Sequence, residues 1–176
     1  MSKKYILILF SSANPTGNTA QLVSDLTHRL SHHRVKFIDI DQLNFAHYNY
    51  PNHYPKDDPF YDLAHELDKA DHLVFASPVY WYAVTANMKK LVDRMTELTE
   101  NPTIKPIGKR LKGKHAWVVT TSASEQKCEV FAGFFSRLFA YFALNQGGLL
   151  HINCRDKYVI DEPALSHFVT KLLAVK

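Results

Sequence analysis

The chain has 176 residues, of which 46% are apolar and 22% are charged, so it is long enough for one domain with a sizeable core. This composition excludes a disordered, collagen-like or low-complexity chain. The net charge is +4 and the sequence pI is about 9.0, yet no basic stripe with a nucleic-acid reading motif is present, so we expect no nucleic-acid partner.

Strand-like and helix-like periodicities alternate along the first half of the chain. A continuous apolar run at 5–10 predicts a strand buried on both faces. Apolar residues spaced three and four apart predict a helix over 18–30, and a second strand follows at 35–40. An irregular segment at 44–59, rich in Asn, Pro, Tyr and His, leads into a short helix at 60–69.

The second half continues the alternation. Strands are predicted at 72–76, 114–121 and 149–154, and helices at 86–98, 125–144 and 165–173. We interpret the basic run 105–114 as a solvated loop, the alternative being a surface that attracts an anionic ligand. No repeat or linker divides the chain, so residues 1–176 are predicted to form one domain.

Strands that alternate with helices predict an α/β fold with a parallel sheet and helices on both faces. Five strands and five helices in this order fit the flavodoxin-like three-layer sandwich, with strand order 2-1-3-4-5. In such a sheet ligands bind outside the carboxyl ends of the strands, where the strand order reverses. The loops after the first, third and fourth strands are therefore the candidate site.

The loop at 11–19 joins the first strand to the first helix and contains Ser and Thr hydroxyls, a glycine and a helix N-terminus. These groups suit a phosphate monoester, because hydroxyls, backbone amides and the helix dipole all favour an anion. The loop has no Lys or Arg, and it matches neither the Walker ending nor G-x-G-x-x-G. The alternative is a polar turn in which Asn18 caps the helix.

The other two loops complete the predicted site. Residues 77–83 include three consecutive aromatics, on which a planar ring can stack; the alternative is a hydrophobic plug or a dimer contact. Residues 120–125 are small and polar, so their backbone can approach a ligand closely, although they can also simply cap a helix that starts near Glu125. A phosphate cradle, an aromatic wall and a small-residue floor together describe a site for flavin mononucleotide (FMN).

Two segments of the chain resemble the NAD(P)H-dependent FMN reductase and quinone reductase branch of the flavodoxin-like superfamily. They are the loop 11–19, and Ser77-Pro-Val-Tyr-Trp81 with the downstream Asn87-Met-Lys-Lys-Leu-Val-Asp-Arg94. The resemblance runs over nearly the whole chain. It implies FMN as cofactor, hydride transfer from NAD(P)H to a quinone, flavin or similar small acceptor, and a homodimer or homotetramer.

The resemblance also implies the residues of the site. The cofactor-binding residues would be Ser11, Ser12, Asn14, Gly17, Asn18, Thr19, Pro78, Val79, Tyr80, Trp81, Thr121, Ser122 and Ala123. No catalytic side chain is implied, because the flavin carries the redox chemistry. Ser11 stands where the family often has Gly, and Asn14 stands where it frequently has a basic residue, which weakens charge-assisted phosphate contact. Some relatives carry an iron–sulfur cysteine cluster after the second strand, but 44–59 has no cysteine, so we predict no cluster and no metal site.

Two other functions remain as alternatives. A flavodoxin-type one-electron carrier usually docks its partners through an acidic surface, which the basic chain disfavours. The second alternative is a binding module that has the same fold but binds no flavin. No membrane-length apolar run or signal peptide is present, and the cysteines, Cys128 and Cys154, form no disulfide framework, so we expect a cytoplasmic protein.

Two further expectations concern helices. Asp93 and Arg94 are interpreted as surface charges at a helix end. The helix predicted at 125–144 carries aromatics on more than one face, with Phe134 and Tyr141 away from the main apolar stripe. An exposed aromatic patch predicts self-association. The alternative is that the segment 44–59 folds over this helix.

Overall fold

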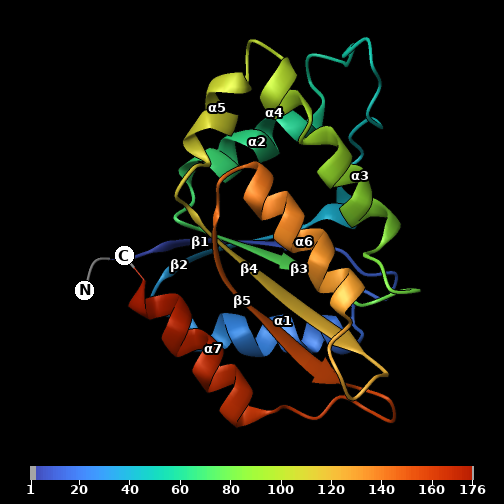
Figure 1. Cartoon of the computed structure of the whole chain (residues 1–176), viewed down its shortest axis with the longest axis vertical. Helices are drawn as coiled ribbons and strands as arrows, with labels where there is room; N and C mark the ends of the chain where they lie inside the picture. The colour runs from blue at the N-terminus through green and yellow to red at the C-terminus, as the bar shows by residue number, and fades with distance from the viewer. Residues whose placement is uncertain (1–2, 176) are drawn as a thin grey trace.

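Five parallel strands form the central sheet of the computed structural model, which describes residues 3–175 (Figure 1). The strands are β1 (Tyr5–Phe10), β2 (Arg34–Asp39), β3 (His72–Ala76), β4 (His115–Ser122) and β5 (Asn145–Asn153). Their order is β2-β1-β3-β4-β5, and every neighbouring pair is parallel. The predicted strand order and fold class are therefore confirmed.

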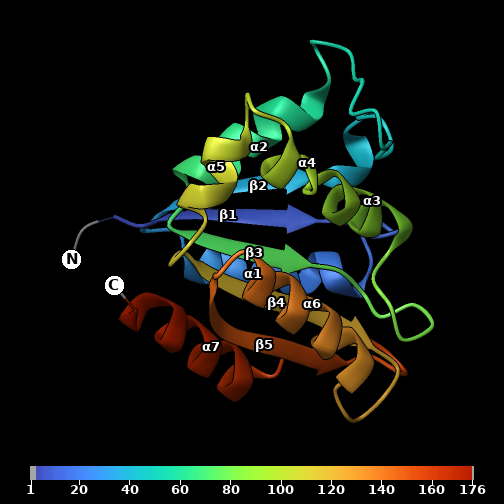
Figure 2. The ribbon, with the colours of Figure 1, turned by 45° about the horizontal axis from the view of Figure 1, so that its top comes forward.

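Helices cover both faces of the sheet, as Figures 1 and 2 show. One face packs against α1 (Asn18–Arg29) and α7 (Glu162–Ala174). The other face packs against α2 (Pro59–Lys69), α3 (Ala86–Arg94), α4 (Glu97–Glu100), α5 (Lys105–Arg110) and α6 (Glu129–Tyr141). A short 3₁₀ turn, η1 (Ile40–Gln42), follows β2.

The side chains of β1 show why its sequence is an unbroken apolar run. Leu7 and Leu9 belong to the core beneath α2 and α6, whereas Ile8 and Phe10 belong to the core beneath α1 and α7. Successive strand residues point to opposite faces, so a strand covered on both faces needs an apolar residue at every position. The observed bounds of β1 and β3 equal the predicted ones.

Several predicted element bounds were wrong. The helix predicted from 125 begins at Glu129, because Cys128 has an extended backbone and its Sγ accepts the Phe131 amide as a cap. The basic run predicted as a loop contains α5, whose Pro106 is compatible with a first helical turn. The last strand, predicted from 149, begins at Asn145, because its first four residues, which include Gly147 and Gly148, have no apolar side chains from which a strand could be predicted.

The helix predicted over 86–98 is two helices, α3 and α4, and two of its charged side chains, Arg94 and Glu97, are buried. Arg94 and Glu97 are both 0% exposed, and Arg94 Nε lies 2.7 Å from Glu97 Oε1. Arg94 Nη1 also donates to Asp58 Oδ2 at 3.0 Å and to the Ala46 carbonyl at 2.7 Å. The interpretation of Arg94 as a surface charge was wrong, because loop 44–59 and α4 supply its acceptors.

The aromatic face of α6 is narrower than the sequence suggests. Phe131, Phe135 and Phe139 are buried, and Phe134 packs partly buried against the same core, edge-on to Phe135. The expectation that Phe134 lies away from the packed stripe was wrong, whereas Tyr141 is 70% exposed.

Loop 44–59 packs against α3 and α4. Tyr48 and Asn52 both hydrogen-bond to Glu100, and Tyr54 lies under the guanidinium of Arg94. The alternative that this loop folds over α6 is therefore wrong. Within residues 3–175, no helix has the length and apolar character that a membrane span requires.

Gly108 lies where α5 crosses α4, and a Cβ at this position would overlap the Leu98 carbonyl oxygen. We expect Gly108→Ala to lower the free energy of unfolding by about 1–3 kcal/mol through overpacking. Gly133 in α6 is the matched control, since an added Cβ would meet only the flexible side chain of Arg137, at 3.0 Å. Gly133→Ala should raise stability by up to about 1 kcal/mol. Urea denaturation measures both, and a neutral Gly108→Ala would contradict this tight crossing.

Candidate functional site

A cavity of about 370 Å³ lies beyond the carboxyl ends of β1, β3 and β4. In Figure 2 the arrowheads of these strands point toward the loops that form it. The cavity is lined by Ser12, Asn14, Gly17, Asn18, Thr19, Pro78, Val79, Tyr80, Thr121, Ser122, Ala123 and Cys154. All predicted site residues line this cavity except Ser11 and Trp81.

The start of α1 forms one end of the cavity. Gly17 precedes the helix with an extended backbone, and no side chain of the described residues caps the amides of the first turn. The alternative that Asn18 caps this helix is therefore wrong. Asn14 instead shapes the loop, with its carbonyl accepting from the Gly17 amide and its Oδ1 accepting from the Thr16 amide, both at 3.1 Å. Uncapped first-turn amides and the positive end of the helix dipole favour negative charge at this end.

Hydroxyl groups line the same end of the cavity. The Oγ1 atoms of Thr19 and Thr121 are 2.7 Å apart, which ties the first loop to the end of β4. Ser12 and Thr19 are both buried, yet both border the cavity. No Lys or Arg of the described chain lines it, so a bound anion would be held by hydrogen bonds and the helix dipole alone.

The loop after β3 forms a second wall through Pro78, Val79 and Tyr80. The Val79 amide donates to the Thr121 carbonyl at 3.0 Å, which extends the pairing between β3 and β4 into the loop. Beyond Tyr80 the chain reverses in a two-residue turn, with Trp81 at φ 48° and Tyr82 at φ 66°. Trp81 is 93% exposed. The hydrophobic-plug alternative is therefore wrong, because all three aromatics are exposed, Tyr80 at 42% and Tyr82 at 65%.

The loop after β4 forms the third wall. Ser122 Oγ lies 2.8 Å from His151 Nε2 of β5 and accepts from the Ser124 amide at 3.2 Å. Burial lowers the pKa of His151 below its ordinary value of 6.5, so its imidazole is neutral at pH 7. Residues 123–127 are exposed and α6 starts only at Glu129, so the expected capping of a helix near Glu125 was wrong.

Two residues near the cavity were missed by the sequence analysis. Cys154 lines the cavity from the end of β5, where its amide donates to the Ser122 carbonyl at 2.7 Å, and burial raises the pKa of its thiol. Asp41 of η1 lies behind the first loop and accepts the Ser12 amide at 2.7 Å. Cys154 follows β5, which lies beside β4, so the predicted strand order could have indicated that it borders the cavity. The sequence around Asp41 contains no pattern that indicates its contact with the first loop.

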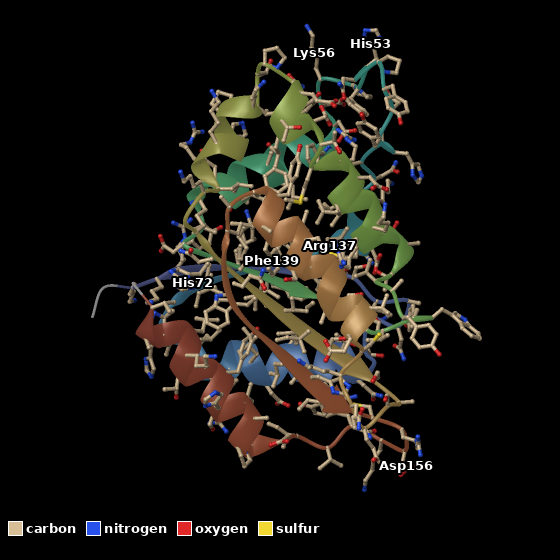
Figure 3. All side chains as sticks on the ribbon, in the orientation of Figure 1. His53, Lys56, His72, Arg137, Phe139 and Asp156 are labelled. Atoms are coloured by element: carbon tan, nitrogen blue, oxygen red, sulfur yellow. The ribbon has the colours of Figure 1, made fainter. Side chains whose placement is uncertain are left out.

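A larger cavity, of about 770 Å³, lies at the other end of the sheet, where β3 and β4 begin. His72, labelled in Figure 3, marks this end. Arg110, Lys112 and Lys114 of the basic run line it, but the ammonium of Lys114 is already bound to two backbone carbonyls and Arg110 pairs with Asp68. The smaller cavity, where three loops converge at the reversal of strand order, is therefore the candidate functional site. Residues 3–175 contain no group of His, Cys, Asp and Glu side chains suited to a metal ion.

This fold and cavity define a flavodoxin-like α/β protein with an uncapped helix N-terminus at the switch point of its sheet. Residues 5–133 match the family model described as NADPH-dependent FMN reductase. The chain therefore belongs to the NADPH-dependent FMN reductase family, as its loops led us to expect.

Two curated proteins are similar to part of the chain. An iron-sulfur flavoprotein of Archaeoglobus fulgidus is 35% identical over 77 residues, which cover 44% of this chain and 32% of that protein. The putative NAD(P)H-dependent FMN-containing oxidoreductase YwqN of Bacillus subtilis is 22% identical over 73 residues, covering 42% of this chain and 40% of that protein. Each match thus spans less than half of the relative's own length.

Solved structures resemble the whole chain in fold. The Trp repressor binding protein from Bacillus subtilis superposes with a TM-score of 0.72 at 18% identity, covering 98% of this chain and 100% of that one. An NADPH-quinone reductase from P. pentosaceus superposes with a TM-score of 0.67 at 15% identity, covering 98% and 99%. At these identities the likeness establishes the fold.

Proposed function

We propose that this chain is an FMN-dependent oxidoreductase that transfers hydride from NAD(P)H to a quinone, flavin or similar small acceptor. The observation that carries the proposal is the convergence of an uncapped helix N-terminus, an aromatic loop and a small-residue loop on one cavity. Its volume of about 370 Å³ falls within the range of about 300–1,000 Å³ for small-molecule sites. Membership of the NADPH-dependent FMN reductase family supports the same cofactor and reductant.

The donor set of the cavity fits FMN. Ser12, Thr19 and the first-turn amides of α1 would hold the phosphate, with Asn14, Gly17 and Asn18 shaping the loop around it. Pro78, Val79 and Tyr80 would lie against the ring, and Thr121, Ser122 and Ala123 would face its polar edge. Ser11 does not line the cavity, and its hydroxyl donates to Asp41 behind the first loop.

When bound, FMN supplies a ring that accepts and returns a hydride. The residues of the chain bind and orient that ring, and no side chain is required as a nucleophile or general base. Tyr80 borders the cavity and Trp81 extends beyond it into solvent, so these aromatics would shape the face used in turn by the nicotinamide and the acceptor. Alternating use of one face predicts ping-pong kinetics.

The decisive experiment measures NADPH oxidation by the purified, FMN-loaded protein with menadione or free FMN as acceptor. We expect turnover with parallel double-reciprocal plots. Bound flavin without turnover would favour the one-electron carrier, and a colourless protein that binds no FMN on titration would favour the flavin-free binding module. Either result would overturn the proposal.

We further propose that the protein forms a homodimer or homotetramer. An exposed apolar surface beside the cavity, formed by Trp81, Tyr82 and Val130, supports this proposal. The turn at Trp81 and Tyr82 is adjacent to the start of α6, because Cys128 Sγ lies 3.9 Å from the Tyr82 carbonyl oxygen. Large exposed apolar patches are uncommon on monomers. Sedimentation at micromolar concentration tests this, and a monomer with and without FMN would refute it.

A further inference from the structure

One carboxylate outside the cavity wall accepts hydrogen bonds from three donors, two in the first loop and one in helix α3. Asp41 Oδ2 accepts the Ser12 amide at 2.7 Å, and its Oδ1 accepts the Ser11 hydroxyl at 3.0 Å. Asn87 Nδ2, in the first turn of α3, donates to Oδ1 at 2.6 Å. Asp41 follows β2, which pairs with β1, so the sheet itself brings this carboxylate to the start of the first loop.

The hydroxyl of Ser11 links Asp41 to the other side of the site. Ser11 is 0% exposed, and its Oγ lies 2.5 Å from Thr85 Oγ1. Thr85 is the N-cap of α3, and its Oγ1 accepts the Met88 amide at 3.3 Å. Thr85 is in turn held to the loop after β3, because its amide donates to Ser77 Oγ at 3.1 Å.

The charge of Asp41 sets the direction of every proton in this chain of hydrogen bonds. An ionised carboxylate only accepts, so the Ser11 hydroxyl donates to Asp41. Ser11 Oγ then accepts from the Thr85 hydroxyl, and Thr85 Oγ1 accepts from the Met88 amide. Each hydroxyl donates once and accepts once, which leaves no buried donor unmatched.

The same contacts fix how the first loop leaves β1. The Ser12 amide is directed at Asp41 and away from the cavity, while Ser12 still borders the cavity. Ser11 stands where the resembling family often has Gly, and here its side chain serves this contact. We propose that Asp41 is a positioning residue that holds the phosphate end of the cavity in its binding geometry through Ser11 and Ser12. This inference rests on the proposed function, since it assumes that FMN places its phosphate at that end.

The test compares FMN with riboflavin, which lacks the phosphate, in fluorescence titrations of the wild type, Asp41→Asn, Ser11→Ala and the control Asp93→Asn. In Asp41→Asn one carboxylate oxygen is replaced by an NH₂ group, which cannot accept a hydrogen bond and would face one of the donors that Asp41 now binds. We expect FMN affinity to fall about tenfold or more and riboflavin affinity by less than about twofold. Ser11→Ala should cost about threefold for FMN alone, because the Ser12 contact remains. Asp93→Asn, on the exposed side of α3, should change neither affinity.

The outcomes separate this inference from the proposed function. If the wild type binds FMN and Asp41→Asn binds it equally well, the positioning role is overturned and the proposed function stands. If Asp41→Asn loses FMN and riboflavin in equal measure, its role is general to the fold and the inference is again overturned. If the wild type binds no FMN, both proposals fall. Should Asp41→Asn not fold, as judged by circular dichroism, Ser11→Ala decides by the same FMN-to-riboflavin ratio.

Discussion

Replacing Arg94 by methionine should lower the free energy of unfolding by about 3–5 kcal/mol. The guanidinium is fully buried and bonded to Glu97, Asp58 and the Ala46 carbonyl, and it lies 3.6 Å above the Tyr54 ring. Methionine fills much of the same volume but leaves two buried carboxylates without their cation. Removing one partner of a buried ion pair is costly because the remaining charge stays desolvated.

The matched control lies on the same helix. Lys89 pairs with Asp93 one turn apart, and both side chains are about half exposed. Lys89→Met removes the same type of charge from a solvated pair and should cost less than about 0.5 kcal/mol. Urea denaturation of both variants measures the contrast. Similar small losses for the two would contradict a buried ion cluster at Arg94.

The same cluster predicts a pH dependence of stability. Burial acts to raise the pKa of Asp58, but the amides of Ala46 and Phe60 and the guanidinium of Arg94 outweigh it and lower that pKa below 3.8. A carboxyl whose pKa is lowered by folding stabilises the fold above its unfolded pKa, and this stability is lost as pH falls through the folded value. Wild-type stability should therefore fall below about pH 4. Arg94→Met should show a shallower acid loss in the same pH series.

The second large effect is expected at the phosphate end of the cavity. Replacing Ser12 and Thr19 together by alanine should weaken FMN binding by about 2–4 kcal/mol, since a hydrogen bond to a charged group contributes about 1.5–3 kcal/mol. Riboflavin binding should change little, because riboflavin presents no phosphate to these hydroxyls. Fluorescence titration with each flavin measures the difference.

Thr16 provides the control for this variant. It lies in the same loop but is exposed, does not line the cavity, and its hydroxyl is bonded to Asn14 Oδ1. Thr16→Ala should therefore leave FMN affinity within about twofold of the wild type. An unchanged affinity in the double variant would remove the phosphate assignment. An equal loss for riboflavin would instead point to disruption of the Thr19–Thr121 contact between loops.

The sequence by itself determined the sheet and the loops that form the candidate site. Each central strand of a covered parallel sheet must be apolar at every position, so the runs at Tyr5–Phe10 and His72–Ala76 could be identified with their bounds. The alternation of strands and helices gave the fold class, and the strand order was inferred from the rules of the flavodoxin-like arrangement. Because parallel strands end at one edge, three loops distant in the sequence could be expected to meet, and they surround one cavity.

Only the tertiary structure decided which polar side chains are buried and what they contact. Arg94 finds Asp58 across 36 positions of sequence, and Ser11 finds Asp41 across 30. Periodicity reports which residues share the face of one element, at spacings of two, three or four, and carries no information about a partner on another element. A charged residue at a helix end has the same local pattern in water and in the core. The packing of loop 44–59 and α2 against α3 buries Arg94, and the pairing of β2 with β1 brings Asp41 to the first loop.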